Sequence, residues 1–232
     1  MKRFFLIAFA LILILPVAHL SGQDCNMYFI SEEGAEMELT HYNPKDKVES
    51  VTRHVIKEKN HINGAVVYTV QHTTYDGKDK EIGSGEFEIK CKDGVFYMDM
   101  KNFLDESMMQ GNEDMEFEMK SEDLEFPSDL SVGQSLSDGS ITATMEGGGM
   151  MSFEMKVKIT DRKVEAKETV TTPAGTFDCY RISYNTQTDM MMMNVNTRSV
   201  DWVAEDVGMV KSETYNKKDK LQSYTLLTDL KK

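Results

Sequence analysis

Residues Phe153–Ile159 (FEMKVKI) alternate between apolar and charged side chains without interruption. In an extended chain successive side chains point to opposite faces, so the apolar residues share one face and the charged residues share the other. A helix with the same spacing would distribute both residue types around its circumference. The stretch therefore predicts a β-strand with one dry and one wet face, which is typical of antiparallel sheets.

The same period of two recurs on both sides of this stretch. Residues 96–101 and 115–120 alternate in the same way, and turn-forming residues interrupt the pattern repeatedly from Ala35 onward. About a dozen strands of this kind must curl to hide their edges. We therefore expect an all-β fold, an antiparallel curled sheet that forms a barrel, a half-barrel or a two-layer sandwich. Residues 102–110 are the exception, because their spacing predicts one short amphipathic helix.

One turn sequence occurs three times. Residues 42–47, 75–80 and 215–220 all read Tyr-[Asn/Asp]-x-Lys-Asp-Lys. Asn or Asp suits the opening position of a type I turn, and the later Asp suits the left-handed conformation that closes a hairpin. Each copy is therefore predicted to join two neighbouring strands.

The N-terminus has the pattern of a secretory signal peptide. Lys2 and Arg3 precede an apolar run, Phe4–Leu15, that is too short to span a bilayer well. Small residues before Gln23 predict a signal peptide over 1–23, and Gln23 stands where a lipobox would need cysteine. We therefore expect an exported, soluble mature chain with no membrane span. It should form a single β domain over 24–232, with two lobes hinged near 121–140 as the alternative.

The chain is acidic, with 39 Asp+Glu against 26 Lys+Arg and a formal net charge of −13. Such a surface repels phosphate groups, which makes nucleic acid and anionic lipid headgroups poor partners. The apolar share of 40% is normal for a folded core and argues against disorder.

Three cysteines, Cys25, Cys91 and Cys179, allow one disulfide and leave one thiol. Disulfides form outside the cytoplasm. Cys91 and Cys179 lie in strand-like segments, so we favour a bridge between them, with Cys25 as the alternative partner. The interpretation that Cys91 and Cys179 are both buried free thiols is almost as well supported.

The sequence has no recognisable catalytic or metal-binding motif. It lacks a Gly-x-Ser-x-Gly elbow and a phosphate-binding glycine loop, and its histidines after residue 23 have no zinc-ligand spacing. These histidines are His41, His54, His61 and His72. We therefore expect a protein that is not an enzyme and that needs no cofactor or metal. A cleft that joined His54 or His72 to a carboxylate and a nucleophile would favour an enzyme instead.

Two features of the composition need an interpretation. The acidic segment 113–129 is predicted to be a solvated strand face rather than a calcium site. Methionine occurs 18 times, with clusters at Met190–Met193 and at 150–155. We rank core filling first, the lining of an adaptable cavity or contact surface second, and a Cu(I) site third.

Four segments carry a resemblance to a known family: Cys91–Met100, Leu130–Leu136, Arg162–Tyr180 and Trp202–Lys211. They resemble the TapB-like family of secreted proteins from Gram-negative bacteria, which is allied to a domain-of-unknown-function group of β-barrel-like periplasmic proteins. The resemblance implies an all-β domain that is periplasmic or secreted in a Gram-negative bacterium, and it brings no activity or catalytic residue. Within these segments Gly208 predicts a bulge or a close backbone approach, and Trp202 predicts a core anchor rather than a ligand platform.

A wide curled sheet can enclose more volume than its own side chains fill. Our leading hypothesis is a non-enzymatic protein that binds an apolar small molecule, a lipid or another amphipathic ligand, or a lipidated partner, in the concave face of the sheet. The sequence does not identify the ligand-binding residues. The alternative is a structural or interaction module of the cell envelope that binds another protein through a strand edge or its acidic face.

Overall fold

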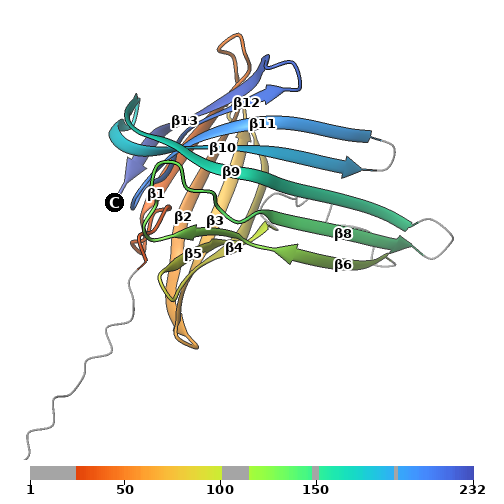
Figure 1. Ribbon diagram of the computed structural model, residues 1–232, viewed down its shortest axis with the longest axis horizontal. Coiled ribbons are helices and arrows are strands. Elements are labelled where there is room, and N and C mark those ends of the chain that lie inside the picture. The colour runs from red at the N-terminus through yellow and green to blue at the C-terminus, as the bar shows by residue number, and fades with distance from the viewer. Residues whose placement is uncertain (1–24, 101–114, 148–151, 191–192) are drawn as a thin grey trace, which may run out of the picture.

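The computed structural model describes residues 25–100, 115–147, 152–190 and 193–232 (Figure 1). The predicted signal peptide over 1–23 and the predicted helix at 102–110 lie outside the described residues. The strands are β1 (Glu36–Tyr42), β2 (Val48–Ile62), β3 (Ala65–Asp76), β4 (Glu81–Lys92), β5 (Val95–Met98), β6 (Met115–Glu122), β7 (Leu124–Pro127), β8 (Gly139–Gly147), β9 (Ser152–Thr172), β10 (Gly175–Met190), β11 (Met193–Ala204), β12 (Gly208–Asn216) and β13 (Leu221–Lys231).

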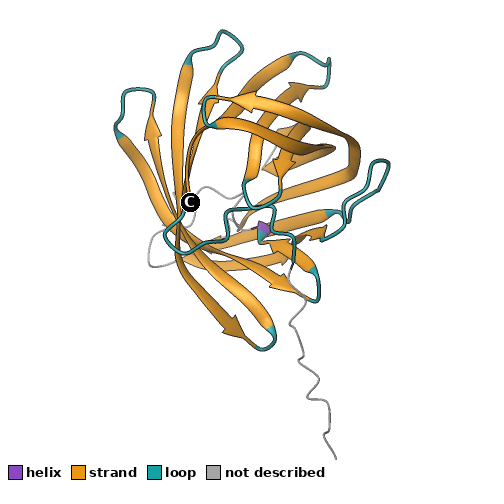
Figure 2. Ribbon diagram, turned by 90° about the vertical axis from the view of Figure 1, so that its left-hand side faces the viewer, coloured by secondary structure: helices purple, strands orange, loops and turns teal. Residues whose placement is uncertain are grey.

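These 13 strands form one antiparallel sheet with the order β6-β8-β9-β10-β11-β12-β13-β1-β2-β3-β4-β5-β7. The first and last strands, β1 and β13, pair in the middle of the sheet. At the two edges, β6 pairs with β8, and β7 pairs with β5. Only Asp123 separates β6 from β7, so the chain itself connects the two edges of the sheet. The all-β prediction is confirmed, and the sheet has the form of a nearly closed barrel (Figure 2).

The three repeated turns join β1 to β2, β3 to β4 and β12 to β13, as predicted. In the first turn, the side-chain Oδ1 of Asn43 accepts hydrogen bonds from the backbone N–H groups of Lys45 and Lys47. Asp76 and Asn216 make the same pair of bonds in the other two turns. The last Asp of each copy has a positive φ, between 53° and 60°. Because neighbouring strands are antiparallel, all three turns lie at one end of the barrel, the turn end.

The opposite end of the barrel is covered by residues 25–35, which we call the plug. The backbone oxygen of Met27 accepts a hydrogen bond from Asp206 in the β11–β12 turn, and Gly34 donates to Ile56 in β2. Tyr28 and Ile30 are almost completely buried. The plug therefore packs across the barrel and belongs to its core.

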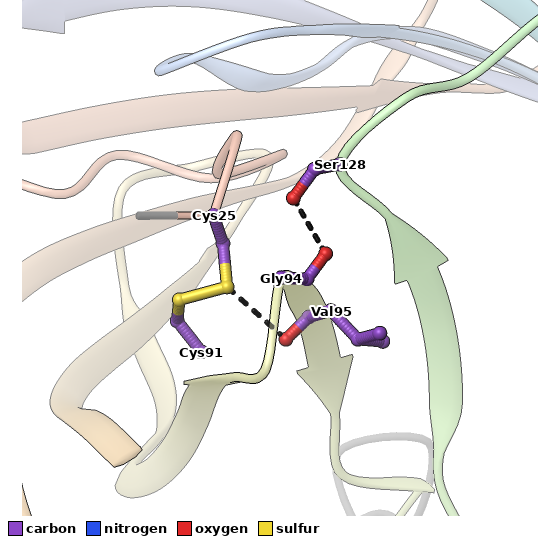
Figure 3. The surroundings of a disulfide bond; sticks show 5 residues. All are labelled: Cys25, Cys91, Gly94, Val95 and Ser128. Carbon is purple, nitrogen blue, oxygen red and sulfur yellow. Dashed lines mark hydrogen bonds between the residues drawn. A yellow bond between two sulfur atoms is a disulfide. The ribbon is translucent and has the colours of Figure 1, made fainter. Parts of the chain in front are cut away.

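A disulfide joins the plug to the wall, between Cys25 and Cys91 of β4 (Figure 3). The sulfur of Cys25 lies 3.3 Å from the backbone oxygen of Val95, next to the point where Ser128 bonds to Gly94. The favoured pairing of Cys91 with Cys179 is wrong, because Cys179 lies on β10, on a distant part of the wall, and is a buried free thiol. The alternative partner, Cys25, is the one that bonds to Cys91, because the burial of the plug brings these two cysteines together.

A β-bulge in β9 turns Arg162 into the barrel. Asp161 has φ 55°, and the pairing of β9 with β10 shifts between Ser183 and Asn185. The bulge reverses the alternation, so that Ile159 and Arg162 both face inward. One guanidinium nitrogen of Arg162, Nη1, donates to the backbone oxygens of Glu125 in β7 (3.1 Å) and of Ser137 (2.6 Å).

The same guanidinium lies 4.5 Å from the centre of the Phe126 ring, also in β7. Residues 133–136 bond to the backbone of β9 next to Arg162. The Arg162 side chain thus ties β9 to the edge strand β7, across a seam where these two strands are not neighbours in the sheet. It acts as a latch that holds the barrel wall closed.

Gly208 begins β12 directly under the plug. Its φ is 98°, and a Cβ atom at this position would lie 3.2 Å from the Cα of Phe29 and 3.3 Å from the backbone oxygen of Tyr28. The predicted close backbone approach is therefore confirmed. Trp202 is 8% exposed and packs in the core, where Lys211 covers its ring, which agrees with an anchor rather than a ligand platform.

We expect Gly208→Ala to lower the free energy of unfolding by about 1–3 kcal/mol, since alanine disfavours the positive φ and its methyl group would press on the plug backbone. Urea denaturation measures this loss. Gly83→Ala is the matched control, because a Cβ atom at Gly83 has nothing within 4 Å. Equal denaturation midpoints for the two variants would contradict the close packing of the plug.

Candidate functional site

A cavity of about 1190 Å³ lies inside the barrel. Residues Tyr28 and Phe29 of the plug contribute to its lining, together with inward-facing side chains from strands all around the wall. Much of the lining is apolar, including Met37, Leu39, Phe87, Phe126, Ile182 and Val203. Typical small-molecule sites measure about 300–1000 Å³, so this cavity has room for a ligand of lipid size.

A belt of polar side chains crosses this apolar lining. Eight strands that are consecutive in the sheet, from β3 round to β9, each contribute one inward-facing polar residue to it. In sheet order the belt consists of Thr74, Thr52, His41, Thr225, Ser212, Asp201, Tyr184 and Arg162. Six of these line the cavity directly, and Thr225 and Ser212 bond to members that do. A continuous polar belt in a chamber with a mostly apolar lining is suited to an amphipathic ligand.

Hydrogen bonds connect one half of the belt through His41. Its Nδ1 lies 2.8 Å from the hydroxyl of Thr225, and its Nε2 lies 3.5 Å from the hydroxyl of Thr52. The Thr52 hydroxyl in turn lies 3.2 Å from that of Thr74. Burial lowers the pKa of His41 below its ordinary value of 6.5, which favours the neutral imidazole at neutral pH.

Asp201 organises the other half of the belt. Its carboxylate accepts hydrogen bonds from the hydroxyl groups of Ser212 (2.6 Å) and Tyr184 (2.9 Å). Burial raises the pKa of Asp201 from 3.8 to about 6, against the opposing effect of these two hydrogen bonds. Burial and the charge of Asp201 also raise the pKa of Tyr184. Asp201 is therefore a carboxylate that lines the cavity and is close to its titration point.

A group of aromatic rings surrounds His54 below the belt. Its ring centre lies 5.7 Å from that of Phe29, 5.9 Å from that of Phe87 and 6.4 Å from that of His72. Nδ1 of His54 is buried and makes no hydrogen bond within the described residues. Burial lowers the pKa of His54 to about 4, so this imidazole is neutral at neutral pH.

Asp201 should make stability depend on pH. Its pKa is about 6 when folded and 3.8 ordinarily, so the folded protein takes up the proton first and gains stability as pH falls through this window. From about pH 7.5 to about pH 4.5 we expect the wild type to gain about 2 kcal/mol relative to Asp201→Asn. Urea denaturation at both pH values measures the difference.

His54 acts in the opposite direction, because a lowered histidine pKa gives stability that is lost as pH falls from 6.5 towards 4. Comparing the wild type with Asp201→Asn cancels this effect, since both proteins keep His54. A difference that does not change with pH would contradict the burial of the Asp201 carboxylate.

Of the methionines, acidic residues and histidines singled out in the sequence, only some line this cavity. Met37, Met98, Met119 and Met209 line the cavity, while Met27 and Met100 are buried, so methionine both fills the core and lines the cavity. Residues 150–151 and 191–192 of the methionine clusters lie outside the described residues. In the acidic segment, Glu118 and Glu122 are exposed on the strand, in agreement with a solvated face. His41, His54 and His72 line the cavity, and His61 is exposed.

The described part of the chain offers neither a metal site nor a membrane-spanning helix. No group of three or more His, Cys, Asp or Glu side chains there is placed to hold a metal ion. None of the helices in that part has the length and apolar character needed to cross a membrane.

The fold and the cavity define a class of protein: a single-sheet antiparallel barrel with a plugged end and an internal chamber. The model of the DUF3108-like family matches residues 32–227. The chain belongs to the DUF3108-like family, which agrees with the expected relation to a domain-of-unknown-function group of barrel proteins. A comparison with curated proteins found no match.

Two solved structures are similar to this chain. One is a predicted exported protein with a YmcC-like fold from Bacteroides fragilis, with a TM-score of 0.73 and 24% identity. The other is a predicted lipoprotein from Parabacteroides distasonis, with a TM-score of 0.74 and 24% identity. Each alignment covers 90% of this chain and 100% of the other. At this identity the comparisons show a shared fold.

Proposed function

We propose that this protein is a non-enzymatic binding protein that holds an amphipathic ligand, such as a lipid or a lipidated partner, inside its barrel. The observation that carries this proposal is the cavity of about 1190 Å³, whose mostly apolar lining is crossed by a polar belt. An apolar ligand body would contact the methionine, leucine and aromatic side chains, and its polar end would bond to the belt. Buried apolar contacts supply affinity, and a few placed polar groups supply orientation.

We further propose that the protein acts outside the cytoplasm, in the periplasm of a Gram-negative bacterium or as a secreted protein. Three observations support this: the signal-peptide pattern over 1–23, the disulfide between Cys25 and Cys91, and the likeness to a predicted exported protein and a predicted lipoprotein. The narrower relation to the TapB-like family belongs to the same proposal.

Mass spectrometry of the native protein, purified from its host without detergent, tests the binding proposal. We expect a co-purified amphipathic compound that is released on denaturation. Met209→Trp should reduce the amount bound, because Met209 lines the cavity and the larger ring would fill part of it. Val132→Trp is the control, since Val132 is 59% exposed on the surface. A ligand-free wild type, or equal loading of both variants, would contradict the proposal.

A second candidate is a module that binds another protein by strand addition at β4. Within the described residues, β5 covers only residues 89–92 of β4. On the side of β4 that faces β5, residues 81–88 therefore form an unpaired edge, which carries the exposed Ile82. Exposed strand edges are sites for β-augmentation. Crosslinking in the host from a photoreactive residue at position 82 should capture one abundant protein if this candidate is correct, and no defined protein if the barrel binds only small ligands.

A further inference from the structure

We propose that the polar end of the ligand is a cation, an ammonium or similar group carried on an apolar body. This inference rests on the proposed function and specifies its ligand class. Glu81, Glu86, Glu88, Asp99 and Asp201 are the carboxylates in the cavity lining. Among the described lining residues Arg162 is the sole Lys or Arg, and it is only 2% exposed. The formal charge of these described lining side chains is therefore negative.

The guanidinium of Arg162 is bound in part by the barrel itself. Its Nη1 donates to the backbone oxygens of Glu125 and Ser137, and its Nη2 is buried without a hydrogen-bond partner within the described residues. The side chain stacks on Phe126 as part of the latch. The lining carboxylates outnumber this guanidinium among the described residues.

Asp201, in contrast, presents its carboxylate to the cavity from a fixed position. Its two oxygens are held by Ser212 and Tyr184, one hydroxyl on each. An ionised carboxylate has about four acceptor positions, so both oxygens keep capacity for another donor. Ile182 is the cross-strand neighbour of Asp201, and Val203 is two residues further on the same face. A cationic group at Asp201 would therefore have apolar wall directly beside it for an alkyl chain.

The aromatic rings of the lining also favour a cationic ligand. Tyr28, Phe29 and Phe87 contribute to the cavity wall, and the Phe126 ring already carries the guanidinium of Arg162. The faces of aromatic rings attract cations and repel anions. The exposed side chains Glu81, Glu86 and Glu88 of β4 are also lining residues, and charge of one sign along a cleft steers ligands of the opposite sign towards it.

Three ligands with the same alkyl chain and different ends test this inference: dodecyltrimethylammonium, dodecanol and dodecanoate. Each displaces a fluorescent apolar probe from the intact wild-type protein at neutral pH, below the concentration at which micelles form. We expect affinity to fall in the order ammonium, alcohol, carboxylate, with at least about a tenfold difference between the first and the last. Equal or tighter binding of dodecanoate would overturn the inference.

The variant Asp201→Asn tests whether the preference for the ammonium ligand depends on the Asp201 carboxylate. This variant keeps an acceptor oxygen in the belt but removes the charge, so it should lower the preference for ammonium over carboxylate several-fold and leave dodecanol binding almost unchanged. Asp178→Asn is the matched control, because it removes the same charge from an exposed position on β10. An Asp201→Asn protein that keeps the full preference would overturn the assignment.

The outcomes separate this inference from the proposed function. If none of the three ligands displaces the probe from the wild type, the proposed function fails. If all three bind with equal affinity, the barrel binds amphipathic molecules and only the charge assignment fails.

Discussion

Replacing Cys25 and Cys91 together by alanine is expected to lower the free energy of unfolding by about 4 kcal/mol. The two cysteines are 66 residues apart, and closing a loop of this length restricts the unfolded chain by about this amount in the chain-entropy account of disulfides. The bridge also holds the plug against β4 and β5, so its loss removes a link between the plug and the wall. Urea denaturation of the double variant and of the oxidised wild type measures the effect.

Cys179→Ala is the control for this prediction, because Cys179 is a buried free thiol on a different strand. Its substitution removes one sulfur atom from the core and should cost clearly less than the double substitution. Peptide mapping without reduction should recover a linked peptide that contains Cys25 and Cys91. A linked peptide that contains Cys179, or a double variant as stable as the wild type, would contradict the pairing.

Arg162→Ala is expected to lower the free energy of unfolding by about 3 kcal/mol. The substitution removes two charge-assisted hydrogen bonds to the backbone oxygens of Glu125 and Ser137, and it removes the stacking on Phe126. Burial disfavours the charged guanidinium and lowers the pKa of Arg162 to about 10. Because the wild type bears this desolvation cost, the expected loss of unfolding free energy is smaller than the sum of the contacts removed. Urea denaturation measures the loss, and hydrogen exchange should show faster opening of β7.

Two further variants make this test specific. Arg162→Met keeps much of the side-chain volume, so its smaller loss isolates the hydrogen bonds from the packing. Arg181→Ala removes an arginine that is 38% exposed and paired with Glu168 at 3.6 Å, and such a surface pair contributes only about 0.5 kcal/mol. Arg162→Ala and Arg181→Ala with equal losses would contradict the latch.

The fold could be predicted because alternation records which side of a strand faces water. The pattern at 153–159 identifies a strand, and the repeated turns identify where strands reverse. The alternation fails at Asp161, whose positive φ inserts a bulge and turns Arg162 inward. Extending the pattern from Ile159 would place Arg162 on the outer face, so the latch could not be found from the period alone.

The polar belt is hidden from the sequence for a related reason. Its eight residues lie on eight strands, and in the sequence a threonine or aspartate at an inward position looks the same as one on a wet face. Only the curvature of the nearly closed sheet brings Asp201 and His41 into one cavity. The plug can be recognised in the sequence, because residues 27–30 (MYFI) form an apolar run whose exposure to water would be unfavourable. That run argues for a buried segment, and therefore for Cys25 as a disulfide partner.

The pairing of β1 with β13 sets the order in which this protein can be built. Glu36 lies opposite Lys231, so the barrel closes by pairing residues that lie 195 positions apart in the chain. Contacts this distant along the chain slow folding. The barrel can close only when β13 is available to pair with β1. Until then β1 has an unsatisfied edge, and a nascent chain stalled before residue 221 should be a strong substrate for chaperones that bind exposed strands.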